Sequence, residues 1–484
     1  MFDDLSKLAC NPETAWRCSE IESGIKSAQG IVDGYRTIFM SDRDRILYCK
    51  SFRRLAGKTQ VYTPSQGDDK RTRLTHTLEV SQITRTIALA LELNCDLTEA
   101  IALGHDIGHT PFGHAGERML HEIMSPPNTP ETQAPKSTVI YKLPGYVEQH
   151  KYINYYGFKY NLQSVRAIVE DLDAKDSQFG LDVTNYTLWG IMHHSAISFK
   201  ERQVNTDFII PKFYDGYMKY CQTIEGRDAW SFEGLIVAEA NEIAQMHHDL
   251  EDAIRGRALP KVRVLELIEM LNDIMPESNQ LILNELRSKP ISQEWLLNPI
   301  SKIIVDTLVS NLVKASKENL RQLLNEYDVA QIFELQSNNE FIQHAISYDT
   351  YGTNKASDIV SKFKHRLSET ALNNYHVQRS DSKGKYIIKN LFEAYNTNPQ
   401  QLPNYAIKNL YKELKKQNYG FSKEISSFSD DDTSELRLAV VEAINDIKKE
   451  NKVRYLICVM RIICDHIARM TDNYAISEYE KLYG

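Results

Sequence analysis

The sequence predicts an all-α protein on the strength of two observations. Apolar residues recur at helical spacing through several long segments, and no sustained alternation of apolar and polar residues marks pairs of long strands. The chain has 484 residues, of which 42% are apolar, so it is long enough to bury a large core. This length allows two or three domains.

The predicted helices can be placed in order along the chain. Residues 77–93 put Leu78, Val80, Ile83 and Ile87 near one helical face. The next segment, residues 96–106, starts with a capping Asp or Thr and then stays apolar up to a His-Asp pair. Further helical segments are residues 232–257, 299–324 and 434–475.

Two loop-rich stretches suggest how the chain is divided. Residues from about 124 to 155 are rich in Pro, Thr, Ser and Asn and predict an insertion that leaves the core. A second stretch, "SKPISQEWLLNPI", predicts a boundary near residue 290. We therefore expect a core over 1–290 and a helical C-terminal region over 291–484. Its last helix, about 450–475, is expected to pack back near the candidate site.

Composition narrows the class of protein. The formal net charge is -8, which argues against a protein that binds nucleic acid over most of its surface. A local basic patch could still bind phosphates. The seven cysteines form no C-x-x-C pair, which is typical of a reducing compartment. The first ten residues are acidic without an apolar run, and no stretch of eighteen apolar residues occurs. We expect a cytoplasmic protein without a signal peptide or membrane span.

Histidines gather in one part of the sequence. Five of the 14 histidines lie between residues 76 and 121. His76, His105 and Asp106 come in an order that can hold a divalent ion, provided the end of the helix with the His-Asp pair faces the ion. Mixed nitrogen and oxygen donors suit Mn, Fe, Co, Ni or Zn, or Mg with added water. Such an ion polarises phosphoryl oxygens and activates water.

Basic residues precede this cluster. Arginine side chains form bidentate contacts with phosphate, so a cationic run beside a metal ligand predicts a phosphate-rich substrate. The alternative is a solvated basic face. The run comprises Arg53, Arg54, Lys58, Lys70, Arg71 and Arg73.

An acid-base pair follows the His-Asp pair. His114 and Glu117 are three residues apart and share a face if this segment is helical. A carboxylate that orients an imidazole is an arrangement suited to general acid-base catalysis.

These motifs together resemble the deoxyguanosine-triphosphate triphosphohydrolases of the HD-domain superfamily. "DRDRI", "FRRL", "KTQV", "RTRLTH" and "HDIGHTPFGHAGE" occur in the family's order between Tyr35 and Leu120. The resemblance returns at residues 160–168, 238–256 and 465–475, and is not evident over about 260–440.

The resemblance implies an HD-domain helical core and a reaction in which a dNTP, with dGTP as first candidate, and water give a deoxynucleoside and triphosphate. The implied cofactor is a divalent metal such as Mn or Mg. Implied catalytic residues are His114, Glu117 and His109, and implied substrate-binding residues are Arg73, Gln60, Asp249, Arg54 and Lys58. His121 matches no family position and is expected at the surface.

One motif departs from the family pattern. The chain reads "ANEIAQ" where the family has an Asp as the last metal ligand, so Asn241 takes that place and Gln245 replaces a Tyr. Three outcomes are open: Asn241 ligates weakly, Glu239 or Glu242 replaces it, or the site binds metal poorly.

Two other functions compete with this one. The chain could be an HD phosphodiesterase or nucleotidase, since activated water can attack other phosphoesters. It could also be a degenerate nucleotide sensor, with Asn241 as the sign of lost catalysis. As partners, the resemblance implies a dNTP substrate, a dNTP effector, a homo-oligomer and single-stranded DNA, and no membrane.

Overall fold

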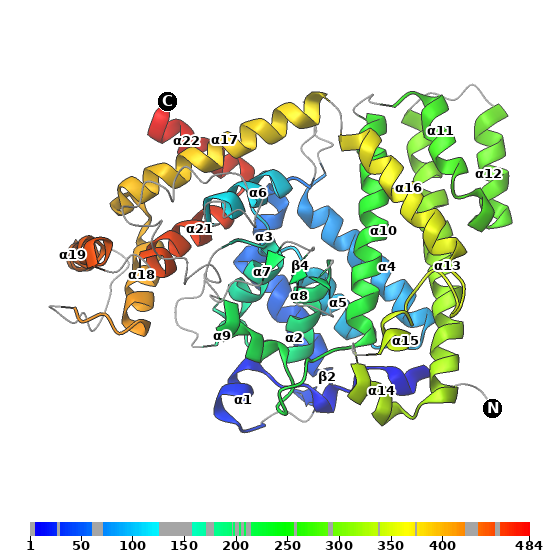
Figure 1. Cartoon of the computed structure of the whole chain (residues 1–484), viewed down its shortest axis with the longest axis horizontal. Coiled ribbons are helices and arrows are strands. Elements are labelled where there is room, and N and C mark those ends of the chain that lie inside the picture. The colour runs from blue at the N-terminus through cyan, green and yellow to red at the C-terminus, as the bar shows by residue number, and fades with distance from the viewer. Residues whose placement is uncertain are drawn as a thin grey trace, which may run out of the picture.

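In the residues that it describes, the computed structural model consists of helices joined by loops, with only short strands (Figure 1). The all-α prediction is therefore confirmed. No described helix combines the length and the apolar character needed to cross a membrane. The structure describes residues 5–26, 30–60, 71–124, 157–170, 179–195, 197–198, 203–204, 208–209, 214–255, 259–288, 294–336, 339–372, 375–421, 434–450 and 455–484.

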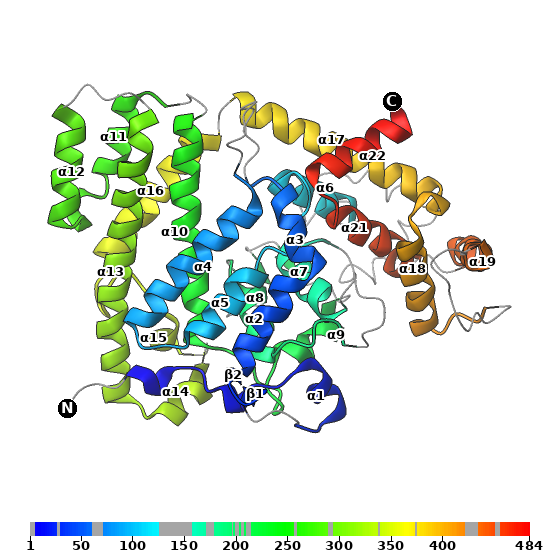
Figure 2. The ribbon, with the colours of Figure 1, turned by 180° about the vertical axis from the view of Figure 1, so that it is seen from behind.

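Three helices form the centre of the molecule. They are α4 (Arg73–Ala90), α5 (Cys95–Gly104) and α10 (Phe232–Arg255), and each contacts the other two. Figures 1 and 2 show α4 and α10 side by side through the middle of the ribbon. The buried apolar residues of α10, such as Ile236 and Ile243, recur at helical spacing and face this core. These helices carry the candidate metal ligands.

Four further helices form two contacting pairs. One pair is α2 (Ile38–Tyr48) with α3 (Lys50–Arg54), and the other is α7 (Tyr160–Val169) with α8 (Asn185–His193). Both α2 and α8 pack on α5. All of α8 except its last residue is buried, which is typical of a helix in the core.

The described strands form two small antiparallel ribbons. The first pairs β1 with β2, and the second has the order β3-β4-β5. Each strand has two residues, so the ribbons do not build a core. The strands β1 to β5 span Ile31–Val32, Arg36–Thr37, Ile197–Ser198, Gln203–Val204 and Phe208–Ile209. The short helices α1 (Cys18–Ser23) and α9 (Asp215–Met218) are not part of these ribbons.

A first apolar cluster extends from Leu5 to Leu367. It includes the central helices and a group of helices packed beside α10, of which α13 and α16 contact it directly. The boundary predicted near residue 290 falls within the span of this cluster. The group comprises α11 (Lys261–Glu269), α12 (Glu277–Ser288), α13 (Leu297–Glu326), α14 (Val329–Leu335), α15 (Glu340–Gln343) and α16 (Lys355–Leu372).

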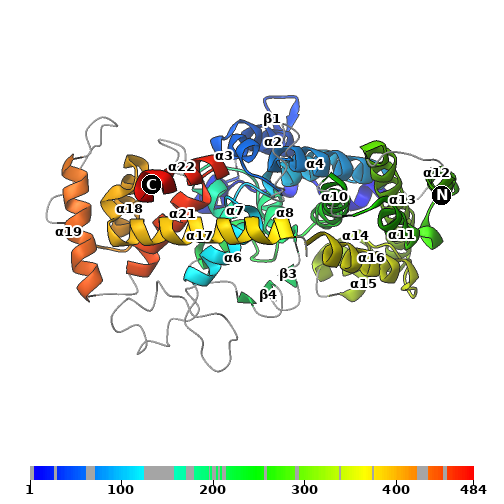
Figure 3. The same ribbon diagram turned by 90° about the horizontal axis from the view of Figure 1, so that it is seen from above.

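A second apolar cluster joins α6 (Gly113–Met124) to the C-terminal helices. Figure 3 shows the long helix α17 lying along α6 and α21, and these pairs are in contact. The segment that carries His114 and Glu117 is thus packed against the last part of the chain. The C-terminal helices are α17 (Tyr375–Thr397), α18 (Asn404–Lys416), α19 (Ser434–Glu450), α21 (Arg461–Ala468) and α22 (Asp472–Tyr483).

Some predicted bounds differ from the structure. The helical segment predicted over 434–475 is divided in the structure: α19 ends at Glu450, and α21 and α22 are separate helices where one last helix was predicted over about 450–475. Thr471 starts α22 because its side chain accepts a hydrogen bond from Tyr474 N at 3.3 Å, as a capping residue does. The insertion predicted over about 124–155 lies outside the described residues, apart from Met124.

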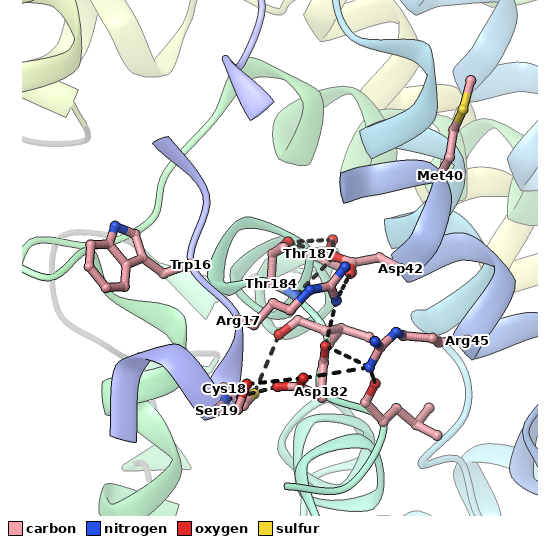
Figure 4. Close-up of polar contacts among 12 residues, drawn as sticks. Trp16, Arg17, Cys18, Ser19, Met40, Asp42, Arg45, Asp182, Thr184 and Thr187 are labelled. Carbon is pink, nitrogen blue, oxygen red and sulfur yellow. Dashed lines mark hydrogen bonds and ion pairs between the residues drawn. The ribbon is translucent and has the colours of Figure 1, made fainter. Parts of the chain in front are cut away.

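A buried ion pair connects the N-terminal segment to α2 and α8 (Figure 4). Arg17 Nη1 lies 3.2 Å from Asp42 Oδ1. Asp42 Oδ2 accepts hydrogen bonds from the Thr184 hydroxyl at 2.6 Å and the Thr187 hydroxyl at 2.8 Å. Burial raises the pKa of Asp42, against the opposing effect of Arg17 and the hydroxyls. The carboxylate of the "DRDRI" motif thus has a structural role here.

We expect Asp42→Ala to lower the free energy of unfolding by about 3–5 kcal/mol, because it leaves Arg17 buried without its carboxylate. Chemical denaturation of the purified protein measures this loss. Asp44→Ala is the control on the same helix: its ion pairs with Arg36 and Arg43 are partly exposed and contribute about 0–1 kcal/mol. Equal losses in the two variants would contradict the role given to Asp42.

Candidate metal and phosphate site

Three elements bring the candidate ligands together. His76 lies in the first turn of α4, which Thr72 caps by accepting a hydrogen bond from Thr75 N. The helix α5 ends at Gly104, so His105 and Asp106 follow directly at its end. The end of this helix thus brings both side chains close to His76. His76, His105 and Asp106 are buried, and one ligand atom from each lies within 4.8 Å of the others.

The His76 ring has a defined neighbour at each nitrogen. Its Nε2 lies 3.0 Å from Asn241 Oδ1, and its Nδ1 lies 3.1 Å from His248 Nδ1. Burial lowers the pKa of His76 well below its usual range. Nε2 of this ring faces Asn241, the residue that the resemblance matches to the family's last metal ligand.

The His105 ring leaves one nitrogen for a ligand. Its Nδ1 lies 2.6 Å from the carbonyl oxygen of Ala102, so it carries the proton and donates it. Its Nε2 is buried, has no hydrogen-bond partner among the described residues, and lies 3.5 Å from Asp106 Oδ1. A buried imidazole lone pair without a partner is costly unless an ion or proton fills the space beside it.

The donor set fits a divalent cation. It offers two imidazole nitrogens, the Asp106 carboxylate and the Asn241 amide oxygen, which suit a borderline transition ion. The alternative ligands predicted on α10 have other surroundings. Glu242 pairs with Lys364 of α16, and burial with the neighbouring Glu242 charge raises the pKa of Glu239 to about 7.

Arg73 places positive charge beside this cluster. Its Nη1 donates to Asp106 Oδ2 at 2.7 Å. Burial alone would raise the pKa of Asp106, but the guanidinium holds it well below its usual range. Arg73 Nε and Nη2 are buried and have no partner among the described residues. Gly113, at φ 58°, leaves room for them, because a Cβ there would lie 3.2 Å from Nη2. These N–H groups can take a phosphate.

His114 and Glu117 meet as their spacing predicts. His114 Nδ1 lies 3.1 Å from Glu117 Oε2, and the His114 side chain is 48% exposed. Lys159 Nζ lies 3.0 Å from Glu117 Oε1. Burial would raise the pKa of Glu117, but His114 and Lys159 lower it to about 2. The carboxylate stays charged and orients the imidazole, so Nε2 of His114 is left for proton exchange.

His109 lies between this pair and the metal cluster. Its ring stacks on Tyr160 with centroids 4.2 Å apart and meets the His114 ring edge-on at 5.1 Å. Burial lowers the pKa of His109, and its Nδ1 has no partner among the described residues. His121 was expected at the surface, and this is wrong: it is half-buried, and its Nδ1 accepts a hydrogen bond from Phe158 N at 3.3 Å.

The other predicted cations have separate neighbours. Lys58 is buried and donates to the carbonyl oxygens of His109 and Ala468, and burial followed by nearby arginines lowers its pKa to about 7. Lys58 and Arg54 line a small pocket with Arg469. Arg71 pairs with Glu251 and Asp252 on α10, Arg53 is exposed, and Lys70 lies outside the described residues.

The two residues predicted to bind the sugar are partly buried. Gln60 Oε1 is buried without a hydrogen-bond partner among the described residues. Asp249 lies on α10, where burial and the neighbouring Asp252 and Glu242 raise its pKa to about 7. Both groups can accept or donate hydrogen bonds to a hydroxyl group.

Sequence reasoning missed the residue that holds two site loops together. Asp472 accepts hydrogen bonds from Thr59 N at 3.1 Å, from the Thr59 hydroxyl at 2.6 Å and from Phe112 N at 3.0 Å. It thus joins the "KTQV" and "PFGHAGE" motifs to the start of α22. The signal in the sequence was the Asp of "MTDNYA", because an aspartate cannot contribute to the apolar face of a helix.

Tyr160 and His194 were also missed. The Tyr160 hydroxyl lies 3.1 Å from His194 Nε2, and the His194 ring lies 4.8 Å from the His105 ring. Tyr160 thus packs on the His109 ring, and His194 packs on the His105 ring. The motif "YNLQSVRAI" begins at Tyr160 and was the available signal.

Comparisons with known proteins agree with this geometry. The HD domain model matches residues 73–143, and the phosphohydrolase-associated domain model matches residues 427–481. The chain is 30% identical to a deoxyguanosinetriphosphate triphosphohydrolase-like protein of Geobacter metallireducens over 96% of this chain and 92% of that protein. It is also 30% identical to a protein of the same name from Rickettsia rickettsii over 93% of each.

A shorter match has a higher identity. A deoxyguanosinetriphosphate triphosphohydrolase-like protein of Caldanaerobacter subterraneus is 40% identical over 240 residues, which are 49% of this chain and 52% of that protein. The resemblance found in the sequence is confirmed. The chain is an HD-domain phosphohydrolase and belongs to the family of deoxyguanosinetriphosphate triphosphohydrolase-like proteins.

Proposed function

We propose that the protein is a metal-dependent dNTP triphosphohydrolase, with dGTP as its first candidate substrate. One observation carries the proposal: the buried cluster of His76, His105 and Asp106 adjoins Arg73, whose Nε and Nη2 have no partner among the described residues. A cation site and phosphate donors thus share one buried space, as a polyphosphate substrate requires. The relatives' names point to the same substrate class.

In this proposal the metal is held by His76 Nε2, His105 Nε2, the Asp106 carboxylate and the Asn241 amide oxygen. A divalent ion there supplies Lewis-acid polarisation of a phosphoryl oxygen and activation of water. Arg73 binds the phosphate next to it and keeps Asp106 charged. Arg54 and Lys58 are proposed to meet the remaining phosphate charge.

The proton needed by the leaving group comes from His114. Water adds to the α-phosphorus and releases one proton to solvent, the bond from that phosphorus to the 5′ oxygen breaks, and His114 afterwards regains a proton from solvent. The 5′ oxygen takes the proton from His114 Nε2, while Glu117 holds Nδ1 at 3.1 Å. His109 contacts the α-phosphate. The products are a deoxynucleoside and triphosphate.

Selection of the sugar is assigned to Gln60 and Asp249. A buried polar group shaped for a 3′ hydroxyl rejects an analogue that lacks it, because the group is then left unpaired. Oε1 of Gln60, which has no hydrogen-bond partner within the described part of the chain, is consistent with this role. A 2′,3′-dideoxynucleotide should therefore be a poor substrate.

The direct test is to identify the phosphorus product. The protein is incubated with each dNTP, singly and in mixtures, with Mn²⁺ or Mg²⁺, and products are read by ³¹P NMR. Triphosphate supports the proposal. Monophosphate or pyrophosphate would instead indicate the phosphodiesterase or nucleotidase alternative, and no turnover under any condition would indicate a sensor. Stimulation in mixtures alone would reveal a nucleotide effector.

We expect Asn241→Asp to lower the metal concentration that gives half-maximal activity. The new carboxylate would lie beside His76 Nε2, 3.0 Å from the present amide oxygen, and add a negative charge. The measurement is a titration of rate against Mn²⁺ or Mg²⁺. Asn284→Asp, on the exposed face of α12, adds the same charge elsewhere and should not shift the curve.

Two results would count against this ligand role. An unchanged curve with unchanged turnover means that Asn241 is not a metal ligand, and makes Glu239 or Glu242 the candidate in its place. Loss of activity with retained metal means that the neutral amide is itself required.

A homo-oligomer, single-stranded DNA binding and a cytoplasmic location stay predictions from the sequence.

A further inference from the structure

A second group of metal-ligand side chains lies on the other edge of the His76 ring. Glu79 follows His76 by one turn on α4, and His247 and His248 stand opposite on α10. One ligand atom from each of these three residues lies within 4.8 Å of the others. The group is separate from the first cluster, since it shares none of the residues that compose it.

The donors of this group converge on one carboxylate. His248 Nε2 contacts Glu79 Oε2, and His247 Nδ1 lies 3.7 Å from the same oxygen. The opposite nitrogen of His247 is already engaged, because its Nε2 lies 2.8 Å from the Ser301 hydroxyl and 3.4 Å from Glu251 Oε2. An outer partner of this kind fixes a histidine for ligation through its other nitrogen.

Charge and access also suit a cation. The group and its ion-paired neighbours contain three carboxylates, of Glu79, Glu251 and Asp252, and two guanidinium groups, of Arg71 and Arg255, so one negative charge is in excess. The Glu79 side chain is 41% exposed, whereas His248 is 1% exposed. An ion can therefore enter along Glu79 and reach buried nitrogen.

We propose that Glu79, His247 and His248 form a second, inhibitory site for a borderline transition-metal ion such as Zn²⁺. Two imidazole nitrogens and one carboxylate oxygen, with a fourth position open, are a donor set that Zn²⁺ accepts. Mg²⁺ prefers oxygen donors and retains its water, so it should bind here more weakly than Zn²⁺.

The inhibition follows from the contact between the two histidines. The Nδ1 atoms of His76 and His248 are 3.1 Å apart, and a hydrogen bond there needs a proton on one of them only. When His76 Nε2 holds the first ion, Nδ1 of His76 carries that proton. His248 must then accept at Nδ1, so its own proton is on Nε2 and is donated to Glu79.

An ion at the second site requires the reverse arrangement. His248 Nε2 must lose its proton to bind the ion, so Nδ1 of His248 carries one. His76 then accepts at Nδ1 and has its proton on Nε2, which cannot ligate. With both ions bound, two N–H groups face each other. Each ion therefore weakens the binding of the other, reciprocally.

The first experiment measures metal binding without nucleotide. Metal-free protein is dialysed against Zn²⁺, and bound zinc is measured by elemental analysis. Wild type should bind one ion tightly and a second more weakly, whereas His247→Gln should bind one. His365→Gln is the matched control: His365 pairs with Glu369 across one exposed turn of α16 and should leave both ions. His247→Asn serves if the Gln variant fails to fold.

The second experiment measures inhibition. With the hydrolytic reaction running in Mg²⁺, added Zn²⁺ should slow wild type and His365→Gln. In His247→Gln the inhibiting Zn²⁺ concentration should rise by more than about 100-fold, since loss of an outer partner alone costs roughly 10- to 100-fold in metal affinity.

Two results would overturn the inference. One is a wild-type protein that binds a single zinc ion. The other is a His247→Gln variant that still binds two ions or is inhibited like wild type, which would place the inhibitory ion elsewhere. The binding experiment uses no nucleotide, so its outcome is independent of whether the proposed reaction is right.

Discussion

His105→Ala is expected to reduce hydrolysis to background while the protein stays folded. His105 Nε2 is the buried nitrogen without a partner among the described residues, so its removal takes away a metal donor. Among the described residues, the hydrogen bond lost is that from Nδ1 to the Ala102 carbonyl, which contributes about 1 kcal/mol. Turnover, bound metal by elemental analysis and thermal unfolding are measured on the same preparation.

The matched control is His365→Ala, which removes an exposed imidazole from α16 and should change none of the three quantities. Asp106→Asn is the companion variant: it removes the charge but keeps an oxygen for Arg73 Nη1, which lies 2.7 Å from Asp106. Near wild-type turnover in a His105→Ala protein shown to be free of metal would mean that the reaction does not need the metal.

His114→Ala is expected to lower turnover by about 10²- to 10⁴-fold, the scale for a positioned general acid. Bound metal and KM should change little, because His114 is half-exposed and contacts Glu117 rather than the ligand cluster. Steady-state kinetics separate kcat from KM. Arg118→Ala, an exposed neighbour on α6, should leave both unchanged. A rise in KM with kcat intact would assign His114 to substrate binding.

The sequence predicted the parts of the site whose residues follow a fixed local spacing. The pairing of His114 with Glu117 depends on one helical turn. The grouping of His76 with His105 and Asp106 followed from their order and from the end of α5 after the apolar run. The chemistry of these side chains restricts them to few arrangements, so a short motif was sufficient to predict which of them meet.

Contacts between distant segments could not be predicted in this way. Asp42 is bonded to residues 142 and 145 positions later, and Asp472 to a residue 413 positions earlier. Such pairs depend on how the helices pack, which no local period encodes. The break between α21 and α22 was missed because the capping role of Thr471 is set by one side chain inside an apolar helical pattern.

The contact between His76 and His248 is also one between distant segments that local spacing could not predict. The sequence places the two residues 172 positions apart, and only the packing of α4 on α10 brings their rings within 3.1 Å. Their shared proton connects the proposed reaction at the first site with the proposed inhibitory ion at the second.

The most direct test of the proposed function is hydrolysis of dGTP in ¹⁸O-labelled water with Mn²⁺, followed by mass spectrometry of both products. Attack of water on the α-phosphorus predicts triphosphate with one ¹⁸O atom and unlabelled deoxyguanosine. Pyrophosphate or orthophosphate as the first product would contradict the proposal, and so would ¹⁸O in the deoxyguanosine, which would place the attack on the sugar carbon.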